Sequence, residues 1–584
     1  MFEQFTQIRE GLHIDFNVPI EASDGNILCA NVYRPIKEGR YPVILSYGVY
    51  GKDLHFTEIY SSAWRGMLLD CPEVGIGSTN IYQNWEVYDP EKWCPLGYAL
   101  VRVDSRGGGQ SPGFMDPWSS REAQDVYDCI EWAAKQPWCT GKVGMSGISY
   151  YAVNAWQVAA LQPPHLAAIV CWEGFNDAYR NLARPGGIMS EMEINWMKTQ
   201  AAPVQYGRGV NGYRSKVTGL PVSGDVTMTE EELMKNRIDP LKNFLEHPLL
   251  DEFYKDHSVS DYAKIQVPLL SAGNWGGTTL HLKGNIDGYV LAGSENKWLE
   301  VHGKEHWTPF YSQWGMDLQK AFLDHFLKGE DNGFDKRPRV ELKVRYPGEK
   351  FVSRFENEWP IARTVYKKLY FDTDSYSLTD KPTGKKGTFT YRGITDSGVT
   401  FLTPPMEEEV EITGHSLAKL VVSSSTTDAD IFLVLRLFQG DLEEVTFKGS
   451  NDPNTPLAFG WLRASHRKTD ESKSTHYQPY HTHDQLLPLE PGKPVDLNVE
   501  IWPTCIVIPK GYRLGITIRG KDYVNAVAKD GRFHSSNHLR PATGVGSCYH
   551  GHPQDRPPEI FDGEVTLHFS DETYLQVPVI PEKE

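Results

Sequence analysis

The sequence predicts an α/β domain that carries an inserted helical segment and is followed by an all-β domain. Three observations support this. The first 180 residues alternate strand-like and helix-like segments, residues 181–262 lose the strand pattern, and no long helix is expected beyond about residue 340. A chain of 584 residues is also too long for one hydrophobic core, since cores stop growing at roughly 250–300 residues.

The N-terminal part contains short apolar runs with β character, separated by segments of helical periodicity. Expected strands are 26–33, 41–47, 98–104, 142–147 and 166–172, and expected helices are 122–135 and 151–161. A βαβαβ alternation of this kind predicts a mostly parallel sheet with helices on both faces. Strands resume at 267–272 and 297–301, and the segment 318–327 is expected to be the closing helix.

Residues 181–262 are expected to form a helical cap, because charged, helix-favouring stretches such as 230–236 and 240–247 replace the strands there. Beyond it, short alternating segments predict a β jelly roll, with strands at 368–371, 418–423, 431–437, 495–501, 513–518 and 564–569. The expected organisation is a catalytic domain at 1–180 and 263–340, a cap at 181–262 and a jelly roll at 341–584.

The composition of the chain disfavours several classes of binding partner. The net charge of −17 argues against nucleic acid or an anionic membrane surface. The N-terminus has neither the basic nor the apolar region of a signal peptide, and no run approaches the roughly 18 apolar residues of a membrane span. Eight scattered cysteines without a CxxC pair indicate reduced thiols. We therefore expect a cytoplasmic, soluble protein without cofactor or metal; the oligomeric state stays open, a homodimer included.

One segment has the features of a nucleophile elbow, Gly144-Met-Ser-Gly-Ile-Ser-Tyr-Tyr-Ala152. A catalytic serine on an α/β sheet needs a tight strand-to-helix turn with small neighbours, so that its hydroxyl projects above the sheet. Ser149 stands where the strand pattern gives way to the helix and has Gly147 two residues before it, whereas Ser146 lies inside the strand. Ser149 is the predicted nucleophile.

The same segment resembles the elbow of the cocaine-esterase-like α/β-hydrolases, a family that includes X-Pro dipeptidyl peptidases and α-amino-acid ester hydrolases. Its pattern is G-x-S-Y-x-G, and only the last glycine differs here, being Ala152. Further family-like motifs occur in the family's order: Pro42-Val-Ile-Leu-Ser-Tyr-Gly-Val-Tyr-Gly-Lys52, Asp104-Ser-Arg-Gly107, Glu131-Trp-Ala-Ala-Lys-Gln-Pro-Trp138, Trp461-Leu-Arg-Ala-Ser-His-Arg467 and Pro509-Lys-Gly-Tyr-Arg-Leu-Gly-Ile516. The resemblance implies an α/β-hydrolase fold and acyl-transfer chemistry.

Two donors are expected to stabilise the oxyanion that forms when Ser149 attacks a carbonyl. One is the backbone N–H of Tyr150, the residue after the nucleophile. By resemblance, the other is the phenol of Tyr50.

The resemblance also aligns the family's G-P-W-S-H histidine with His306, which is the predicted base, with His302 as its competitor. The spacing of these histidines does not fit an HExxH zinc helix. The β-domain histidines His534, His538, His550 and His552 are expected in turns or at the surface.

The acid of the triad departs from the family pattern. Relatives carry an Asp in a G-W-Y-D-G-like turn, which here reads Ala272-Gly-Asn-Trp-Gly-Gly277 and has Gly276 at the Asp position. Glu173 follows the preceding strand, whose end faces the same side of the histidine loop. We therefore predict a relocated triad of Ser149, His306 and Glu173. Asp177, Glu300, Glu305 or a dyad without an acid remain alternatives.

The sequence thus predicts a serine hydrolase that cleaves an ester or amide bond of a small molecule through an acyl-enzyme. Two alternatives stay open: an X-Pro-type aminopeptidase, and a non-hydrolytic acyl-transfer or rearrangement enzyme of secondary metabolism on the same scaffold. A purely carbohydrate-binding or non-catalytic jelly-roll protein is disfavoured, because the sequence has the elbow together with Tyr50 and His306. Cap aromatics at Trp196, Tyr206 and Tyr213 are candidates to wall the pocket.

Overall fold

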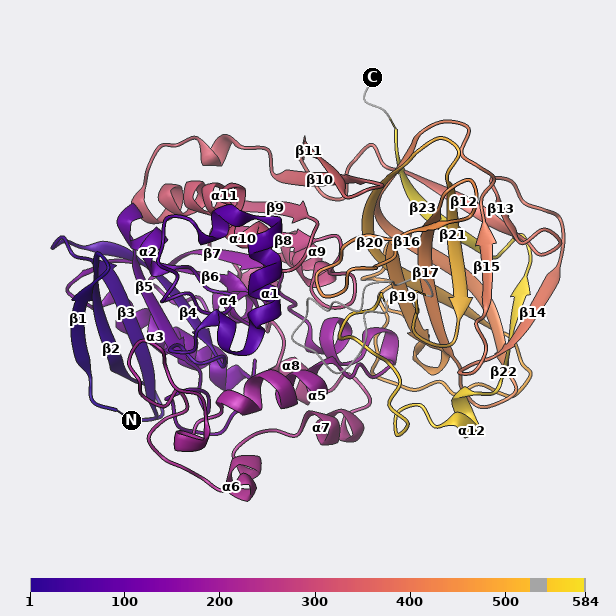
Figure 1. Ribbon diagram of the computed structural model, residues 1–584. Coiled ribbons are helices and arrows are strands. Elements are labelled where there is room, and N and C mark those ends of the chain that lie inside the picture. Colours follow the sequence, from indigo (N-terminus) through magenta and orange to yellow (C-terminus); the bar gives the residue numbers. More distant parts are fainter. Residues whose placement is uncertain (1, 526–543, 582–584) are drawn as a thin grey trace.

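The computed structural model describes residues 2–525 and 544–581. An eleven-stranded mixed sheet forms the first domain (Figure 1). In spatial order its strands are β1 (Phe5–Arg9), β2 (Leu12–Glu21), β3 (Ile27–Pro35), β5 (Ala99–Asp104), β4 (Tyr41–Gly48), β6 (Cys139–Ile148), β7 (Leu166–Trp172), β8 (Leu269–Asn274), β9 (Lys297–His302), β10 (Val340–Tyr346) and β11 (Lys350–Glu356).

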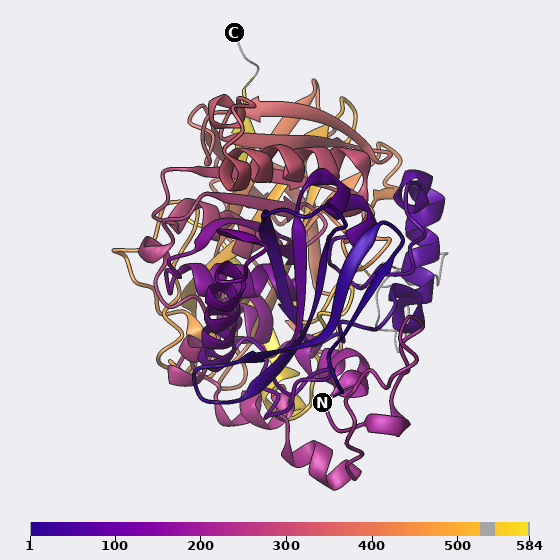
Figure 2. The same ribbon diagram turned by 90° about the vertical axis from the view of Figure 1, so that its left-hand side faces the viewer.

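The central strands, from β5 to β10, are parallel, and the strands at both edges are antiparallel. Figure 2 shows the antiparallel N-terminal strands at the near edge of the molecule. The predicted α/β-hydrolase class is confirmed. The edge strands β1, β2, β10 and β11 were not predicted, and the last two extend this sheet beyond residue 340 to Glu356.

Burial on both faces of the sheet explains the apolar strand sequences. Along β4, Val43 and Leu45 pack into one core cluster and Ile44 into another on the opposite face. This is the two-residue periodicity of a strand covered on both sides. The helices of this domain are α1 (Phe56–Asp70), α2 (Pro90–Trp93), α3 (Ser120–Ala134), α4 (Tyr150–Ala159), α9 (Leu282–Leu291), α10 (Thr308–Tyr311) and α11 (Gln313–Leu323).

The segment between β7 and β8, which we expected to form a cap, contains short helices that lie in the lower part of the molecule in Figure 1. They are α5 (Met192–Trp196), α6 (Glu230–Lys235), α7 (Pro240–Glu246) and α8 (Glu252–Asp256). Capping explains where several begin: Thr229 and Glu232 form a capping box at α6, and Asp239 caps α7, with Pro240 as its first residue.

In its described part the second domain is all β apart from one short helix, α12 (Pro558–Phe561), and one 3-10 turn, Ala464–His466. Its strands pair antiparallel, except β13 with β15. They are β12 (Val365–Asp372), β13 (Ser377–Thr379), β14 (Gly387–Arg392), β15 (Val399–Leu402), β16 (Val410–Ser424), β17 (Asp430–Phe438), β18 (Glu444–Val445), β19 (Ala458–Arg463), β20 (Val495–Ile508), β21 (Arg513–Arg519), β22 (Glu564–Phe569) and β23 (Tyr574–Ile580).

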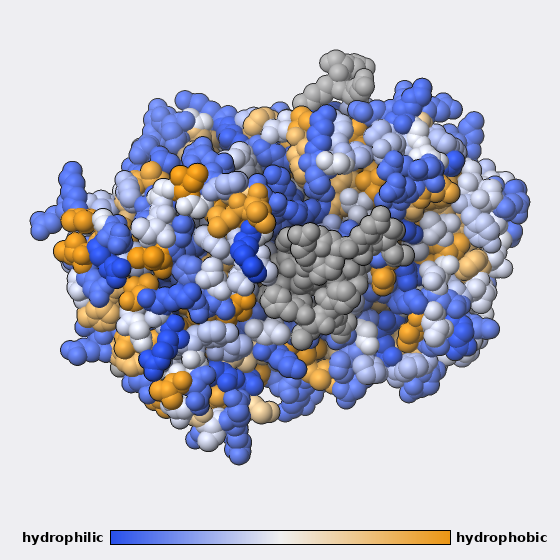
Figure 3. Space-filling model, viewed as in Figure 1, coloured by the Kyte–Doolittle hydropathy of each residue, from blue (hydrophilic) through white to orange (hydrophobic). Residues whose placement is uncertain are grey.

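The molecular surface in Figure 3 mixes hydrophilic and hydrophobic residues over the face shown. None of the helices in the described ranges is both long and apolar enough to cross a bilayer. Of the β-domain histidines expected in turns or at the surface, His550 lies outside helices and strands but is buried, where it contacts Asp522 and its ring packs against Trp461. His534 and His538 lie outside the described residues.

Ala152, which replaces the family glycine, is accommodated by a second glycine. A Cβ atom on Gly174 would lie 2.5 Å from the Cβ atom of Ala152, so only one of these positions can carry a side chain. We predict that Gly174→Ala destabilises the protein by about 1–3 kcal/mol, the usual cost of overpacking. Thermal unfolding measures this.

The matched control for this prediction is the double variant Ala152→Gly/Gly174→Ala. It should recover part of the loss, because the added methyl group would still approach the backbone of Ala152 and Val153 to 3.1 Å. Strictly additive losses in the two single variants would contradict the contact between these positions.

Candidate active site

The candidate residues gather where the parallel strands end. Ser149 follows β6, Glu173 follows β7, and Tyr50 lies two residues after β4. His281 lies in the connection from β8 to α9, and His306 follows β9. Since the carboxyl ends of parallel strands meet at one edge of the sheet, side chains distant in sequence share one site.

Ser149 occupies a strained turn between β6 and α4. Its backbone has φ 58° and ψ −108°, and its N–H donates to the carbonyl oxygens of Trp172 (3.0 Å) and Glu173 (3.1 Å). Gly147 allows this turn, since a Cβ atom there would lie 2.4 Å from the Cβ atom of Tyr151. Ser146 instead points into the core and donates to the Tyr88 hydroxyl at 2.8 Å. The geometry therefore favours Ser149 as the exposed hydroxyl.

Both predicted oxyanion donors are close to Ser149. Tyr50 lines the same pocket, and its hydroxyl oxygen accepts from the indole N–H of Trp196 in the cap at 3.2 Å. The phenolic proton of Tyr50 is thereby left to donate elsewhere. Tyr150 is the first residue of α4, and an N–H at this position has no partner within its helix.

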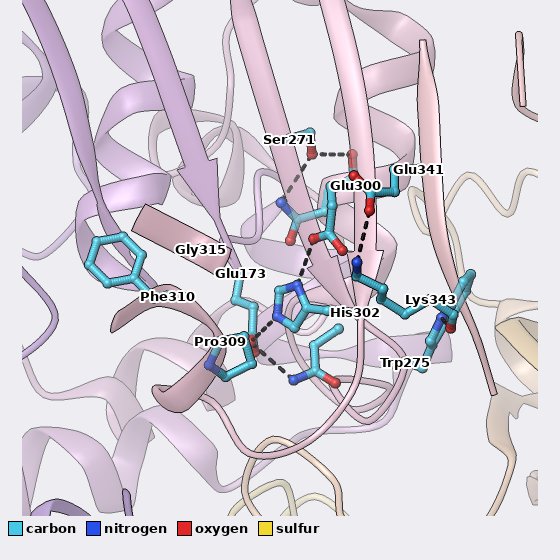
Figure 4. Close-up of polar contacts among 12 residues, drawn as sticks. Glu173, Ser271, Trp275, Glu300, His302, Pro309, Phe310, Gly315, Glu341 and Lys343 are labelled. Carbon is cyan, nitrogen blue, oxygen red and sulfur yellow. Dashed lines mark hydrogen bonds and ion pairs between the residues drawn. The ribbon is translucent and has the colours of Figure 1, made fainter. Parts of the chain in front are cut away.

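The Glu173 carboxylate is completely buried and accepts four hydrogen bonds. Oε1 accepts from Asn274 (3.1 Å) and His302 (3.0 Å), and Oε2 from His306 (2.7 Å) and Ser450 (2.9 Å). Figure 4 shows Glu173, His302 and Glu300 in one chain of contacts. The structure thus brings together Glu173 and His306, the predicted acid and base.

His306 also has a partner that the sequence did not indicate. Its Nδ1 faces Glu173, and its Nε2 lies 3.1 Å from Oε1 of Glu86, in the loop between α1 and α2. His302, the predicted competitor, is held between Glu300 (2.7 Å) and Glu173 (3.0 Å). Neither ring forms the predicted hydrogen bond with Ser149.

A third histidine, absent from our prediction, contacts the serine. Nε2 of His281 lies 3.1 Å from Oγ of Ser149. The His281 ring lies between the parallel rings of Phe175 and His306, whose centroids are 6.1 Å and 5.5 Å away. In this structure Ser149 thus contacts His281, and the predicted base, His306, stacks on the ring of His281.

The ionisation of these groups follows from burial and their partners. Burial alone would raise the pKa of Glu173, but contacts with His306 and His302 hold it well below its usual range. Burial opposes charge on the two histidines, yet the adjacent carboxylates raise the pKa of His306 to about 10 and that of His302 to about 9. Burial, aided by the nearby His306, lowers the pKa of His281 to about 3.

Packing explains why an acid is absent from position 276. A Cβ atom on Gly276 would lie 2.3 Å from Cα of Gly449, in a loop of the β domain. The next residue of this loop, Ser450, accepts from the backbone of His306, donates its backbone N–H to Gly276 and donates its hydroxyl to Glu173. The β domain therefore fills the space that a side chain at position 276 would occupy.

The other candidate acids have different partners. Asp177 caps a helical turn and contacts Arg180 at 2.8 Å, as expected for a structural carboxylate. Glu300 pairs with His302, and Glu305 faces Lys448 at 3.4 Å. Among the described residues, no group of three or more His, Cys, Asp or Glu side chains is arranged to hold a metal ion.

The cavity beside Ser149 is small, about 40 Å³, and mostly aromatic. Residues from all three parts of the chain line it: Tyr50, Trp85, Glu86, Trp118, Ser149, Phe175, Met192, Trp196, Gln200, Leu280, His281, His306, Trp307, Asn451 and Ser547. Of the three predicted cap aromatics only Trp196 is among them. A larger cavity of about 500 Å³ lies across α9, shares none of these residues and does not include Ser149.

Comparison with known proteins identifies the family. The profile of the X-Pro dipeptidyl-peptidase (S15) family matches residues 24–308, and that of the X-Pro dipeptidyl-peptidase C-terminal non-catalytic domain matches residues 332–540. The chain belongs to this family of serine hydrolases. The family is the one that the elbow and its accompanying motifs indicated.

Individual members agree with this assignment. Cocaine esterase from a Rhodococcus species is 26% identical over 573 residues, which cover 87% of this chain and 90% of the esterase. The crystal structure of a CocE/NonD family hydrolase from Staphylococcus aureus is 29% identical, has a TM-score of 0.82 and covers 97% of this chain and 94% of its own. The whole two-domain arrangement is therefore shared.

Two residues at the site escaped the sequence analysis. His281 lies between Leu280 and Leu282, a setting typical of a buried core histidine, and only its place after the end of β8 could have indicated it. Glu86 lies in a segment without regular periodicity. Its φ of 63°, which is uncommon for a residue with a side chain, has no signature in the sequence.

The buried imidazoles make stability depend on pH. His302 and His306 have a higher pKa in the folded protein than the usual 6.5, so their stabilising effect is complete below about pH 6.5 and is lost as pH rises through 9 to 10. We predict that the melting temperature falls between pH 7 and pH 10, and that Glu173→Gln makes this fall shallower.

Asp177→Asn is the matched control for calorimetry over this range. It removes a nearby carboxylate that contacts Arg180 and neither imidazole, so it should keep the wild-type slope. A wild-type melting temperature that stays constant from pH 7 to pH 10 would show that the two rings are not charged in the folded protein.

Proposed function

We propose that this protein hydrolyses an ester or amide bond of a small molecule through an acyl-enzyme on Ser149. One observation carries the proposal: the Ser149 hydroxyl stands on a strained elbow with an imidazole nitrogen 3.1 Å away. A serine hydroxyl is a weak nucleophile until an adjacent base accepts its proton. Tyr50 and the N–H of Tyr150 would stabilise the oxyanion, and the stacked pair of His281 and His306, with Glu173 behind it, would provide the base.

The pocket supports a short acyl group. The free space of about 40 Å³ next to Ser149 is narrow and is bordered by aromatic side chains. An aminopeptidase would need a carboxylate to bind a free amino terminus. The acidic run 225–232 does not line the pocket, and the lining carboxylate, Glu86, already contacts His306. We therefore favour an esterase or amidase of small substrates over the peptidase and the acyl-transfer alternatives.

Labelling with a fluorophosphonate tests the nucleophile. We expect one covalent adduct on Ser149 by mass spectrometry, and p-nitrophenyl acetate to be cleaved faster than the octanoate. Ser149→Ala should abolish both signals. Ser146→Ala is the matched control, because it removes the neighbouring serine of the same segment and should keep the adduct. A labelled Ser149→Ala variant would place the nucleophile elsewhere.

Removal of the Tyr50 hydroxyl tests the oxyanion site. Loss of a single oxyanion donor typically lowers kcat by about 10²–10³-fold. We predict a decrease of this size for Tyr50→Phe, with KM changed by less than about threefold. Steady-state kinetics measure both constants, and Trp196→Phe, which removes the indole N–H that contacts the phenolic oxygen and keeps an aromatic ring, should have a smaller effect. If Tyr50→Phe instead raised KM by about 10²–10³-fold and left kcat unchanged, this tyrosine would be assigned to substrate binding.

A further inference from the structure

The cavity of about 500 Å³ across α9 lies between the two domains and has no part in the chemistry at Ser149. Helix α9 and the segment after β7 line it from the α/β domain, and β19, β20 and the loop 473–483 line it from the β domain. Figure 1 shows α9 on the side of the α/β domain that faces the β domain. A cavity of this volume is typical of a small-molecule site.

Aromatic side chains from separate segments line this cavity. They are Tyr262, Trp359, Trp461, Tyr477, Tyr480 and Trp502. Neighbouring rings fix several of them: Trp461 and Trp502 meet edge to face with centroids 5.4 Å apart, and Tyr477 stacks on Tyr366 at 5.1 Å. The face of an aromatic ring carries partial negative charge and attracts the partial positive charge of C–H groups. Fixed ring faces of this kind suit a ligand with C–H groups on its own faces.

Charged side chains that line the cavity form ion pairs with one another. Nζ of Lys283 lies 2.9 Å from the carboxylate of Asp287 and 2.8 Å from that of Glu500, and Arg180 contacts Asp177 at 2.8 Å. A ligand with a net charge would compete with these contacts and leave a buried group without its counter-charge, which is costly. The cavity therefore favours a neutral ligand whose hydroxyl groups contact the paired charges without separating them.

One buried polar atom at the cavity lacks a partner. Nε2 of His481 forms no hydrogen bond with any described residue, although only 7% of His481 is exposed. Burial lowers the pKa of this imidazole to about 4, so the ring is neutral at pH 7. A buried polar atom without a hydrogen bond costs about 1–3 kcal/mol, and a hydroxyl group serves either tautomer because it both donates and accepts.

We propose that this cavity is a second binding site, which takes a small neutral saccharide. A sugar ring has C–H groups on its faces for the aromatic walls and hydroxyl groups at its edge for His481 and the ion pairs. An apolar ligand would leave Nε2 of His481 unpaired. Because the cavity shares no lining residue with the pocket beside Ser149, this inference stands apart from the proposed function.

Titration calorimetry of the full chain with maltose, cellobiose and xylobiose tests the class of ligand. We expect saturable binding of at least one of these disaccharides, with one site per chain. Titration with inorganic sulfate and with indole gives the comparison. Binding of sulfate or indole without binding of any disaccharide would overturn the proposal, and so would the absence of binding by all three sugars.

Substitutions locate the site. His481→Phe and Tyr480→Ala should each raise the Kd of the disaccharide about two- to tenfold, the contribution of one hydrogen bond or one aromatic contact. Both should still hydrolyse p-nitrophenyl acetate at the wild-type rate, which shows that they fold. His476→Phe is the matched control, because it replaces an exposed histidine of the same loop and keeps a ring against Tyr477. An unchanged Kd in both His481→Phe and Tyr480→Ala would place the sugar elsewhere and overturn the proposal.

Blocking the active pocket distinguishes the two sites. Protein labelled with the fluorophosphonate should bind the disaccharide with the wild-type Kd. Loss of binding on labelling would place the sugar beside Ser149 and overturn the second site. A wild-type protein that forms no adduct but binds the disaccharide would overturn the proposed function and leave the saccharide site intact.

Discussion

Burial of the Glu173 charge is the constraint on which the site depends. A carboxylate removed from water is tolerated only when hydrogen bonds and opposite charges replace its hydration. Here Asn274, His302, His306 and Ser450 supply four donors from three separate segments of the chain. The backbone of the same residue accepts the N–H of Ser149. The ends of β7, β8 and β9, the elbow and a β-domain loop are therefore fixed relative to one another by a single residue.

The fold could be predicted largely from sequence because apolar periodicity reports burial directly. β7 and β22 occur at the expected residues, and α4 begins within one residue of its expected start. The edge strand β11 was missed since most of its residues are exposed or half-buried and lack apolar alternation. β10 is largely buried, and it was missed because the sheet domain was expected to end at residue 340. Local patterns describe what a segment buries, but not which sheet it joins.

Site residues could be predicted only where a motif, or a carboxylate at the end of a strand, marks their position in the fold. Ser149 follows from the elbow, and Glu173 was inferred from a missing acid and a carboxylate at a neighbouring strand end. The structure does bring Glu173 and His306 into contact. His281 and Glu86 could not be inferred, because their places depend on how α9 and an irregular loop pack over the sheet. Long-range packing of this kind leaves no trace in the spacing of residues.

The contact of Gly276 with the Gly449–Ser450 loop means that the two domains do not form independent modules. Ser450 binds the buried acid, and Asn451 and Ser547 line the pocket. An α/β domain produced alone would expose Glu173 to solvent from the side that this loop now closes. Exchange of the β domain between relatives would likewise be restricted to partners with a small residue at position 276. In this protein, the glycine at position 276 and the seating of the neighbouring domain are one and the same packing requirement.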